Sequence, residues 1–243
     1  FTDSVGLNGI FLSNINAGAT KTYVFTAKFN ESADNTFQNS HVTFDITLGI
    51  SIDLPDQCEQ IEFSGDPIFG TSKGDSLKGT AGNDLIVGFE GGDSIDGKGG
   101  DDCILGGDGG DSIKGGSDND IIAGGTGGDS LKGEDGNDLL FGDDGGDSID
   151  GGKGIDLLFG GEGHDSLSGG DDNDKLYGAN GDDSLSGDNG DDELYGENGK
   201  DSLKGGSGND TLVGGASNLD SANGNAGTDK CEAESETACE LNP

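Results

Sequence analysis

The sequence predicts an all-β fold, a parallel β-roll (a β-solenoid) of about eight 18-residue coils preceded by a small antiparallel β-sandwich fragment. Aspartate recurs every nine residues through the middle of the chain, and a leucine or isoleucine follows each aspartate by two residues. The chain holds 51 glycines but only 3 prolines. Hydrophobic residues make up 29 % of it, too few for a conventional globular core, so the repeat itself must organise the fold.

The repeat unit is G-x-x-x-x-D-x-(L/I)-x, and it runs from Gly70 to Val213 without a slip. The residue two positions before the aspartate is usually glycine as well. Because glycine adopts backbone angles that other residues avoid, and aspartate tolerates them, the first six positions indicate a turn. The aspartates of the sixth position are Asp75, Asp84, Asp93, Asp102, Asp111, Asp120, Asp129, Asp138, Asp147, Asp156, Asp165, Asp174, Asp183, Asp192, Asp201 and Asp210.

Each turn is followed by a short strand whose middle residue points inward, since side chains alternate along a strand. Successive strands differ in their outer residues. One kind reads Ser-Ile-Lys, as at 112–114, and the next kind reads Leu-Leu-Phe, as at 139–141. Two repeats therefore complete one coil, with one sheet polar outside and the other apolar outside. At a strand spacing of roughly 4.8 Å, eight coils make a rod about 38 Å long.

The charge pattern argues against nucleic acid as a partner and in favour of cations. The formal net charge is -37, from 49 acidic and 12 basic residues, and every basic residue is a lysine. Nucleic acid selects for basic surfaces, so it is a poor partner. No run of 18 apolar residues occurs, so we expect no membrane span. Self-repulsion opposes a compact state unless cations are recruited.

Calcium suits the turns because it takes six to eight oxygen ligands. Stacking places Asp75 over Asp93 and Asp84 over Asp102, so each pair, with nearby carbonyl oxygens, can hold one ion. Seven gaps on each side of the roll give roughly 14 ions at most, and we expect roughly 10 to 14. With a single Leu or Ile per repeat the interior is thin, so we expect disorder without cations.

Residues 70–213 resemble the RTX nonapeptide-repeat family, whose unit is G-G-x-G-x-D-x-(apolar)-x. The second position departs from glycine in many repeats, where it is Thr, Lys, Asp, Glu, Ala or Phe. The resemblance implies a calcium-binding β-roll in which the sixth-position aspartate is the side-chain ligand. That role falls on the sixteen aspartates named above. Asp220 and Asp229 extend the pattern after a one-residue insertion.

The N-terminal residues differ in kind, because glycine thins out and strand-like runs appear at 22–26 and 41–47. Residues 7–50 resemble the last strands of the camelysin/TasA family of secreted, fibre-forming β-sandwich proteins. This resemblance implies that the given chain starts partway through a sandwich. We expect three parts: an antiparallel β segment (1–63), the calcium-binding roll (64–213), and degenerate repeats with a disulfide-closed C-terminal cap (214–243).

The four cysteines favour disulfides, because their number is even and the setting is extracellular. The short spacing of Cys231 and Cys239 suits a local bridge, with free thiols as the alternative. Cys58 and Cys103 pair by elimination if the N-terminal segment folds back on the apolar sheet. Four cysteines allow three connectivities, so the pairing stays open.

The apolar sheet is expected to present a contiguous hydrophobic surface, which usually marks an interface. Two occupants remain open, the chain's own N-terminal part and a second molecule in self-association or lateral fibre packing. The outward residues that define this surface are Leu85, Leu139, Phe141, Leu157 and Phe159.

The functional expectation is a secreted, cell-surface, matrix or fibre protein that folds and stiffens on calcium. An adhesin, ice- or ligand-binding module is one alternative, and the type I secretion tail of a toxin or hydrolase is another. We expect no enzymatic activity. His41 and His164 are the only histidines, and no motif that activates a nucleophile accompanies them.

Overall fold

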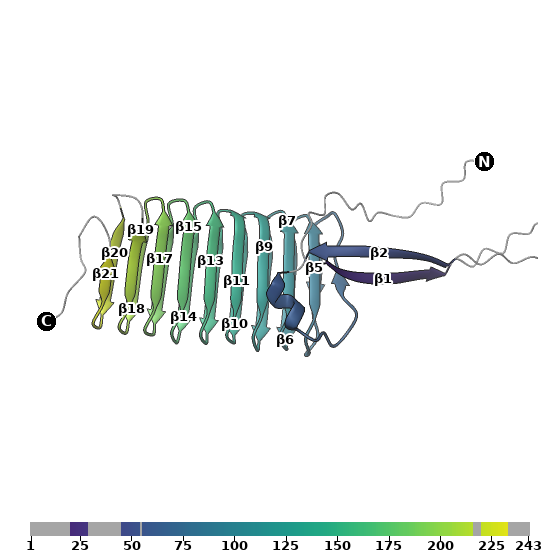
Figure 1. The fold of residues 1–243 in the computed structure, drawn as a ribbon, viewed down its shortest axis with the longest axis horizontal. Helices are drawn as coiled ribbons and strands as arrows, with labels where there is room; N and C mark the ends of the chain where they lie inside the picture. Colours follow the sequence, from purple (N-terminus) through teal and green to yellow (C-terminus); the bar gives the residue numbers. More distant parts are fainter. Residues whose placement is uncertain (1–19, 29–44, 54, 216–219, 233–243) are drawn as a thin grey trace, which may run out of the picture. The chain divides into compact units, whose positions relative to one another are not determined.

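The computed structural model describes residues 20–28, 45–53, 55–215 and 220–232. These residues belong to two compact units, one within 11–60 and the other from 61 onward. The first unit holds strands β1 (Thr20–Lys28) and β2 (Asp45–Asp53) and the 3-10 helix η1 (Asp56–Gln60). The second unit is the roll (Figure 1).

Strands β1 and β2 pair antiparallel, with Thr20 opposite Asp53 and Lys28 opposite Asp45. The strand predicted at 22–26 lies inside β1, which confirms it. The second strand was predicted at 41–47, and in the described residues β2 covers Asp45–Asp53, so it continues beyond the predicted end. Alternation of apolar residues through 46–52 explains this continuation. Residues 41–44 lie outside the described part of the chain.

The roll consists of two parallel sheets whose strands alternate along the chain. The sheet that we call serine-faced contains β4 (Ser76–Lys78), β6 (Ser94–Gly99), β8 (Ser112–Ser117), β10 (Ser130–Asp135), β12 (Ser148–Lys153), β14 (Ser166–Asp171), β16 (Ser184–Asn189), β18 (Ser202–Ser207) and β20 (Ser221–Ala226). The sheet that we call apolar-faced contains β3 (Ile68–Phe69), β5 (Leu85–Glu90), β7 (Cys103–Asp108), β9 (Ile121–Gly127), β11 (Leu139–Gly145), β13 (Leu157–Glu162), β15 (Lys175–Asn180), β17 (Glu193–Asn198), β19 (Thr211–Gly215) and β21 (Lys230–Glu232).

Neighbouring strands of one sheet are 18 residues apart and in register, as predicted from the two kinds of strand. Leu131 lies beside Ile113 and Ile149, and Leu140 lies beside Ile122 and Leu158. The inward residues form one continuous core cluster, in which every buried member is at most 3 % exposed. The period of nine therefore confirms the parallel β-roll and its single inward side chain per strand.

The sheets continue beyond the predicted 64–213. β20 and β21 add a strand to each sheet, with Ala222 and Cys231 at inward positions beside Leu203 and Leu212. The step across the insertion is 19 residues instead of 18. A small inward side chain still packs against the core cluster at this end, so the loss of leucine does not end the roll.

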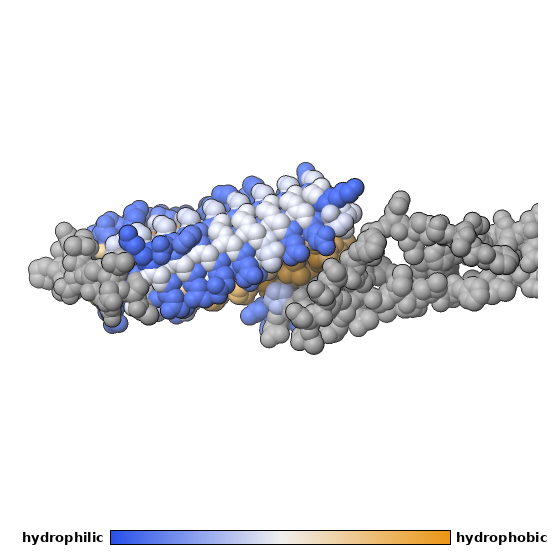
Figure 2. All heavy atoms as spheres, turned by 90° about the horizontal axis from the view of Figure 1, so that it is seen from above, coloured by the Kyte–Doolittle hydropathy of each residue, from blue (hydrophilic) through white to orange (hydrophobic). Residues whose placement is uncertain are grey.

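The two outer faces differ as the sequence predicted. Each of the nine strands of the serine-faced sheet begins with an exposed serine. On the apolar-faced sheet the rings of Phe141, Phe159, Tyr177 and Tyr195 stack at centroid distances of 5.1, 5.0 and 5.0 Å. Hydrophobic surface is in view along one side of the roll in Figure 2.

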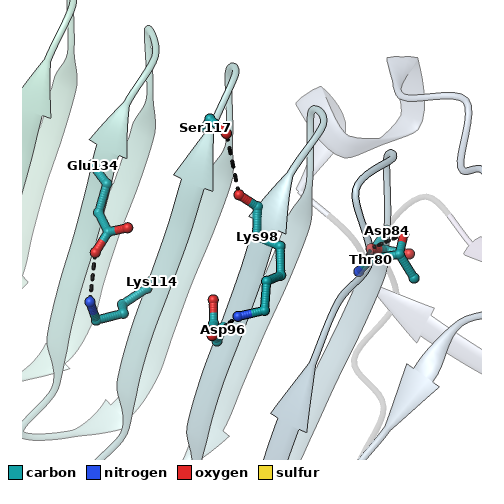
Figure 3. Close-up of polar contacts among 7 residues, drawn as sticks. All are labelled: Thr80, Asp84, Asp96, Lys98, Lys114, Ser117 and Glu134. Atoms are coloured by element: carbon teal, nitrogen blue, oxygen red, sulfur yellow. Dashed lines mark hydrogen bonds and ion pairs between the residues drawn. The ribbon is translucent and has the colours of Figure 1, made fainter.

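Ion pairs join neighbouring coils on the outside of the serine-faced sheet. Lys114 contacts Glu134 at 2.6 Å and Lys132 contacts Asp150 at 2.9 Å (Figure 3 shows the first). Their side chains are 42–51 % exposed, and exposed pairs contribute little to stability. In the part of the chain that the structure describes, no helix has the length and apolar character to cross a bilayer.

The core cluster predicts that Leu140→Ala strongly lowers the stability of the roll, because Leu140 is 0 % exposed and lies beside both neighbouring coils. We expect a loss of about 2 to 5 kcal/mol in the free energy of unfolding. Ser130→Ala on the exposed face is the control and should leave stability nearly unchanged. Urea unfolding at saturating calcium measures both, and equal losses would contradict the core described here.

Candidate metal centre

Each coil turns twice, so the roll has two rims. Rim A is formed by the turns that lead into the serine-faced sheet, and rim B by the turns that lead into the apolar-faced sheet. We call an aspartate that directly precedes a strand of the roll a ladder aspartate. The ladder aspartates of rim A are Asp75, Asp93, Asp111, Asp129, Asp147, Asp165, Asp183, Asp201 and Asp220. Those of rim B are Asp84, Asp102, Asp120, Asp138, Asp156, Asp174, Asp192, Asp210 and Asp229.

In every ladder aspartate after the first of each rim, one carboxylate oxygen joins two coils. The N–H of Asp111 donates to Oδ1 of Asp129 at 2.8 Å, and the N–H of Asp120 donates to Oδ1 of Asp138 at 2.8 Å. The same bond recurs along both rims and extends to Asp220 and Asp229. These bonds hold every side chain of the file in one orientation. The side chains after Asp75 are at most 4 % exposed.

The other carboxylate oxygen, Oδ2, is buried without a hydrogen-bond partner in fourteen of these aspartates, from Asp93 to Asp210. A buried polar atom without a partner costs free energy, and a buried charge costs more unless it is paired. Fourteen repetitions of the same unpartnered oxygen are a systematic feature of the turns. The residues are Asp93, Asp102, Asp111, Asp120, Asp129, Asp138, Asp147, Asp156, Asp165, Asp174, Asp183, Asp192, Asp201 and Asp210.

The first turn of each rim is different. Oδ2 of Asp84 accepts bonds from the N–H of Thr80 at 2.6 Å and from its Oγ1 at 2.9 Å (Figure 3). Thr71 donates in the same way to Asp75, at 2.7 and 2.8 Å. Among the sixteen repeats, threonine stands four residues before the aspartate in these two alone. The sequence therefore carries a signal for this difference, although the prediction treated all sixteen aspartates as equivalent.

Burial without a partner raises the pKa of the fourteen ladder carboxyls from Asp93 to Asp210. Desolvation is the largest cause, and it is opposed by the backbone hydrogen bond to Oδ1 and assisted by the neighbouring carboxylates. The pKa rises to about 8 for Asp120 and Asp174 and to about 7 for Asp102 and Asp156, all on rim B. At neutral pH such a group must either keep a proton or bind a cation.

Glycines keep the space around these oxygens clear. A Cβ on Gly133 would overlap Oδ2 of Asp138 and would lie 2.5 Å from the carbonyl oxygen of Gly151 in the next coil. A Cβ on Gly136 would overlap the carbonyl oxygen of Asp118 and would lie 3.0 Å from Oδ1 of Asp138. Carboxylate and main-chain carbonyl oxygens of neighbouring coils therefore border the same spaces.

This donor set fits a hard, oxygen-binding cation such as calcium. It offers oxygens only, with neither thiolate nor imidazole, which zinc prefers. Among the described residues, no group of three or more His, Cys, Asp or Glu side chains is arranged as a metal site. A cation in these turns would therefore need main-chain carbonyl oxygens as well as carboxylates. The predicted aspartates lie in two regular files, and which of them bind an ion stays a prediction.

The described cysteines are all oxidised. Cys58, Cys103 and Cys231 are each disulfide-bonded, and Cys58 and Cys103 are both 0 % exposed. The expectation of disulfides is therefore confirmed for these three residues. Cys239, the predicted partner of Cys231, lies outside the described residues.

The raised pKa values predict that the cation-free protein becomes less stable as the pH rises. The folded state holds protons that the unfolded chain releases above a pKa of about 3.8, so stability falls as pH rises from about 4 to about 8. We expect the calcium-depleted protein to show more β-sheet circular dichroism near pH 4.5 than at pH 8. Calcium should restore the signal at pH 8. A signal that is larger at pH 8 without calcium would contradict this origin of the shifts.

The close approach of the turn glycines to the backbone of the neighbouring coil predicts that Gly163→Ala is strongly destabilising. Gly163 has φ of 142°, and a Cβ there would overlap the carbonyl oxygen of Gly145. The backbone conformation alone costs about 1 to 3 kcal/mol for a residue with a side chain. Gly65→Ala is the matched control, because a Cβ on Gly65 meets nothing within 4 Å. Thermal unfolding at saturating calcium compares them, and a harmless Gly163→Ala would refute the described packing of the turns.

Comparison with known protein families agrees with this geometry. The repeat family described as the RTX calcium-binding nonapeptide repeat matches six overlapping segments, residues 69–104, 99–131, 123–158, 150–185, 159–194 and 186–218. A search among curated proteins finds no match to this chain. The matched segments together span well over half of the 243 residues. With its nine-residue period, its stacked aspartates and its parallel sheets, this chain belongs to the RTX calcium-binding nonapeptide-repeat family.

Proposed function

We propose that this chain is a secreted structural protein of a cell surface, matrix or fibre, whose roll folds and stiffens when calcium binds. The observation that carries the proposal is the two files of buried Oδ2 atoms without a partner, fourteen in all from Asp93 to Asp210. Family membership supports calcium as the ion that satisfies them. The structural role is favoured because regular coils, stacked in register, suit a rod more than a catalytic pocket.

The chain's own residues prepare the turns for the ion. The Oδ1 hydrogen bond orients each carboxylate, and the glycines admit carbonyl oxygens from the neighbouring coil. Burial excludes water from Oδ2. Bound calcium would supply the positive charge that the stacked carboxylates lack. We infer roughly 10 to 14 ions, with the first turns the least suited, because Thr71 and Thr80 already satisfy Asp75 and Asp84.

An extracellular location is consistent with this requirement. The described cysteines are disulfide-bonded, and disulfides persist in oxidising compartments. RTX repeats are typical of secreted proteins. Calcium-coupled folding would then delay formation of the rod until the chain reaches a calcium-rich medium.

The apolar-faced sheet is the surface that we propose for lateral association of rods. Leu139, Phe141, Leu157 and Phe159 lie half-buried on its outer side. Leu85, which was predicted to belong to this surface, is 1 % exposed and is therefore already covered. The surface available to a second molecule begins further along the roll.

A secretion tail of a toxin or hydrolase is the main competing function, and it shares the calcium-dependent fold. The two functions differ in the behaviour of the folded molecule. A secretion tail needs to fold only as a monomer, whereas a matrix or fibre protein must associate. We infer no catalytic activity for this chain.

The test is circular dichroism and sedimentation of the full chain, first in calcium and then after chelation. We expect a change from coil to β-sheet on calcium addition and calcium-dependent dimers or larger assemblies. Leu139→Ser with Phe141→Ser should reduce assembly without loss of the sheet signal, whereas Ser130→Ala should change neither. Sheet content that survives complete chelation at pH 8 would refute calcium-coupled folding. A calcium-folded protein that stays monomeric would refute the structural role and favour the secretion tail.

A further inference from the structure

The residue immediately before each ladder aspartate differs between the two rims. On rim A this residue is glycine in five successive coils and has a side chain only afterwards. On rim B it always carries a side chain, and that side chain is polar in every coil but one. The residues on rim A are Gly74, Gly92, Gly110, Gly128, Gly146, His164, Asp182 and Lys200. The residues on rim B are Asn83, Asp101, Asn119, Asn137, Ile155, Asn173, Asp191, Asn209 and Thr228.

On rim B these residues form a second hydrogen-bond ladder outside the aspartates. The N–H of Asn119 donates to Oδ1 of Asp101 at 2.9 Å, and the N–H of Asn137 donates to Oδ1 of Asn119 at 2.9 Å. The same bond links the remaining coils between Asn83 and Thr228. The ladder is interrupted only at Ile155, whose side chain has no acceptor and is 61 % exposed.

Rim A has this ladder only in its C-terminal coils. The N–H of Asp182 donates to Nδ1 of His164 at 2.9 Å, and the N–H of Lys200 donates to Oδ1 of Asp182 at 3.0 Å. The glycines before His164 have no side chain to accept such a bond. In Figure 2, which looks onto this rim, near-neutral surface gives way to more hydrophilic surface toward the C-terminal coils.

The backbone does not require glycine at Gly110 and Gly128, whereas a Cβ on Gly74 would lie 2.8 Å from the carbonyl oxygen of Gly92. Gly110 and Gly128 are not among the residues with positive φ, and a Cβ on them would lie 3.3 and 3.4 Å from the nearest atom, a carbonyl oxygen of the next coil. His164 shows that the same position accepts a side chain. At Gly110 and Gly128 the difference between the rims is therefore a property of the side chains and not of the fold.

We propose that the two rims take up calcium in a fixed order, rim B first and the five N-terminal coils of rim A last. The proposal rests on the calcium-binding function proposed above. When rim B orders around the ions, the side-chain hydrogen bonds between its coils form as well and add to the free energy gained, whereas the glycine turns of rim A gain no such bonds and lose the most conformational freedom. At intermediate calcium the roll would be closed along rim B and still open along the glycine part of rim A.

Hydrogen exchange of the full chain tests this order directly. Mass spectrometry in buffers of stepped free calcium would compare residues 125–129, a rim A turn, with residues 134–138, the following rim B turn. We expect protection of the rim B turn at a lower calcium concentration. Equal midpoints, or earlier protection of the rim A turn, would overturn the proposal. Absence of calcium-dependent protection on both rims would instead refute the calcium-binding function itself.

Matched variants test the cause of the order. Gly110→Asn with Gly128→Asn gives rim A the missing acceptors, and we expect its calcium midpoint to fall about twofold to tenfold for each bond formed. Asn119→Gly with Asn137→Gly should raise the rim B midpoint by a similar factor. Gly65→Asn, at a position with no atom within 4 Å of a Cβ, is the control and should shift neither midpoint. If neither double variant shifts the calcium midpoint of its rim, the side-chain ladder does not set the order of binding.

Discussion

The structure depends on one constraint, a carboxylate oxygen that nearly every turn buries and that no protein donor satisfies. The orphaned Oδ2 atoms stand in two files, and each file brings like charges into neighbouring coils. Hydrogen bonds to Oδ1 fix the direction of each side chain, so the charge cannot rotate out to solvent. Protonation, a bound cation or loss of the fold are the ways in which such a group can be accommodated.

The inward side chains cannot supply the stability that the cation would provide. The two sheets approach closely enough that the glycine two positions after each inward residue faces the carboxylate of the next turn, as Gly133 faces Asp138. A larger residue there would displace the carboxylate. The hydrophobic core therefore stays one side chain wide, and the turns carry the part of the stability that a thicker core supplies in other folds.

Periodicity made much of the fold predictable from sequence. The inward positions, the alternation of serine and apolar strands and the parallel register all derive from a period of nine read in pairs. The features that were missed depend on which residues lie one coil apart or face each other within a turn. The bonds from Thr80 to Asp84 and from Asn137 to Asn119 were missed because the predicted stacking shows which residues are neighbours but not which of their atoms bond. Ala222 and Cys231 were missed as inward residues because they stand two residues after Asp220 and Asp229 but are neither leucine nor isoleucine.

The paired period also limits how such a rod can change its length. Removing or duplicating 18 residues would leave each remaining strand beside a strand of its own kind, so both outer surfaces would stay continuous. A change of nine residues would keep every aspartate in a turn but would exchange the surfaces from that point on, placing Leu139 and Phe141 in line with the serines. Rods of this kind can therefore grow or shrink by whole coils without changing what their two sides present, whereas half a coil makes a molecule with a different pattern of sides.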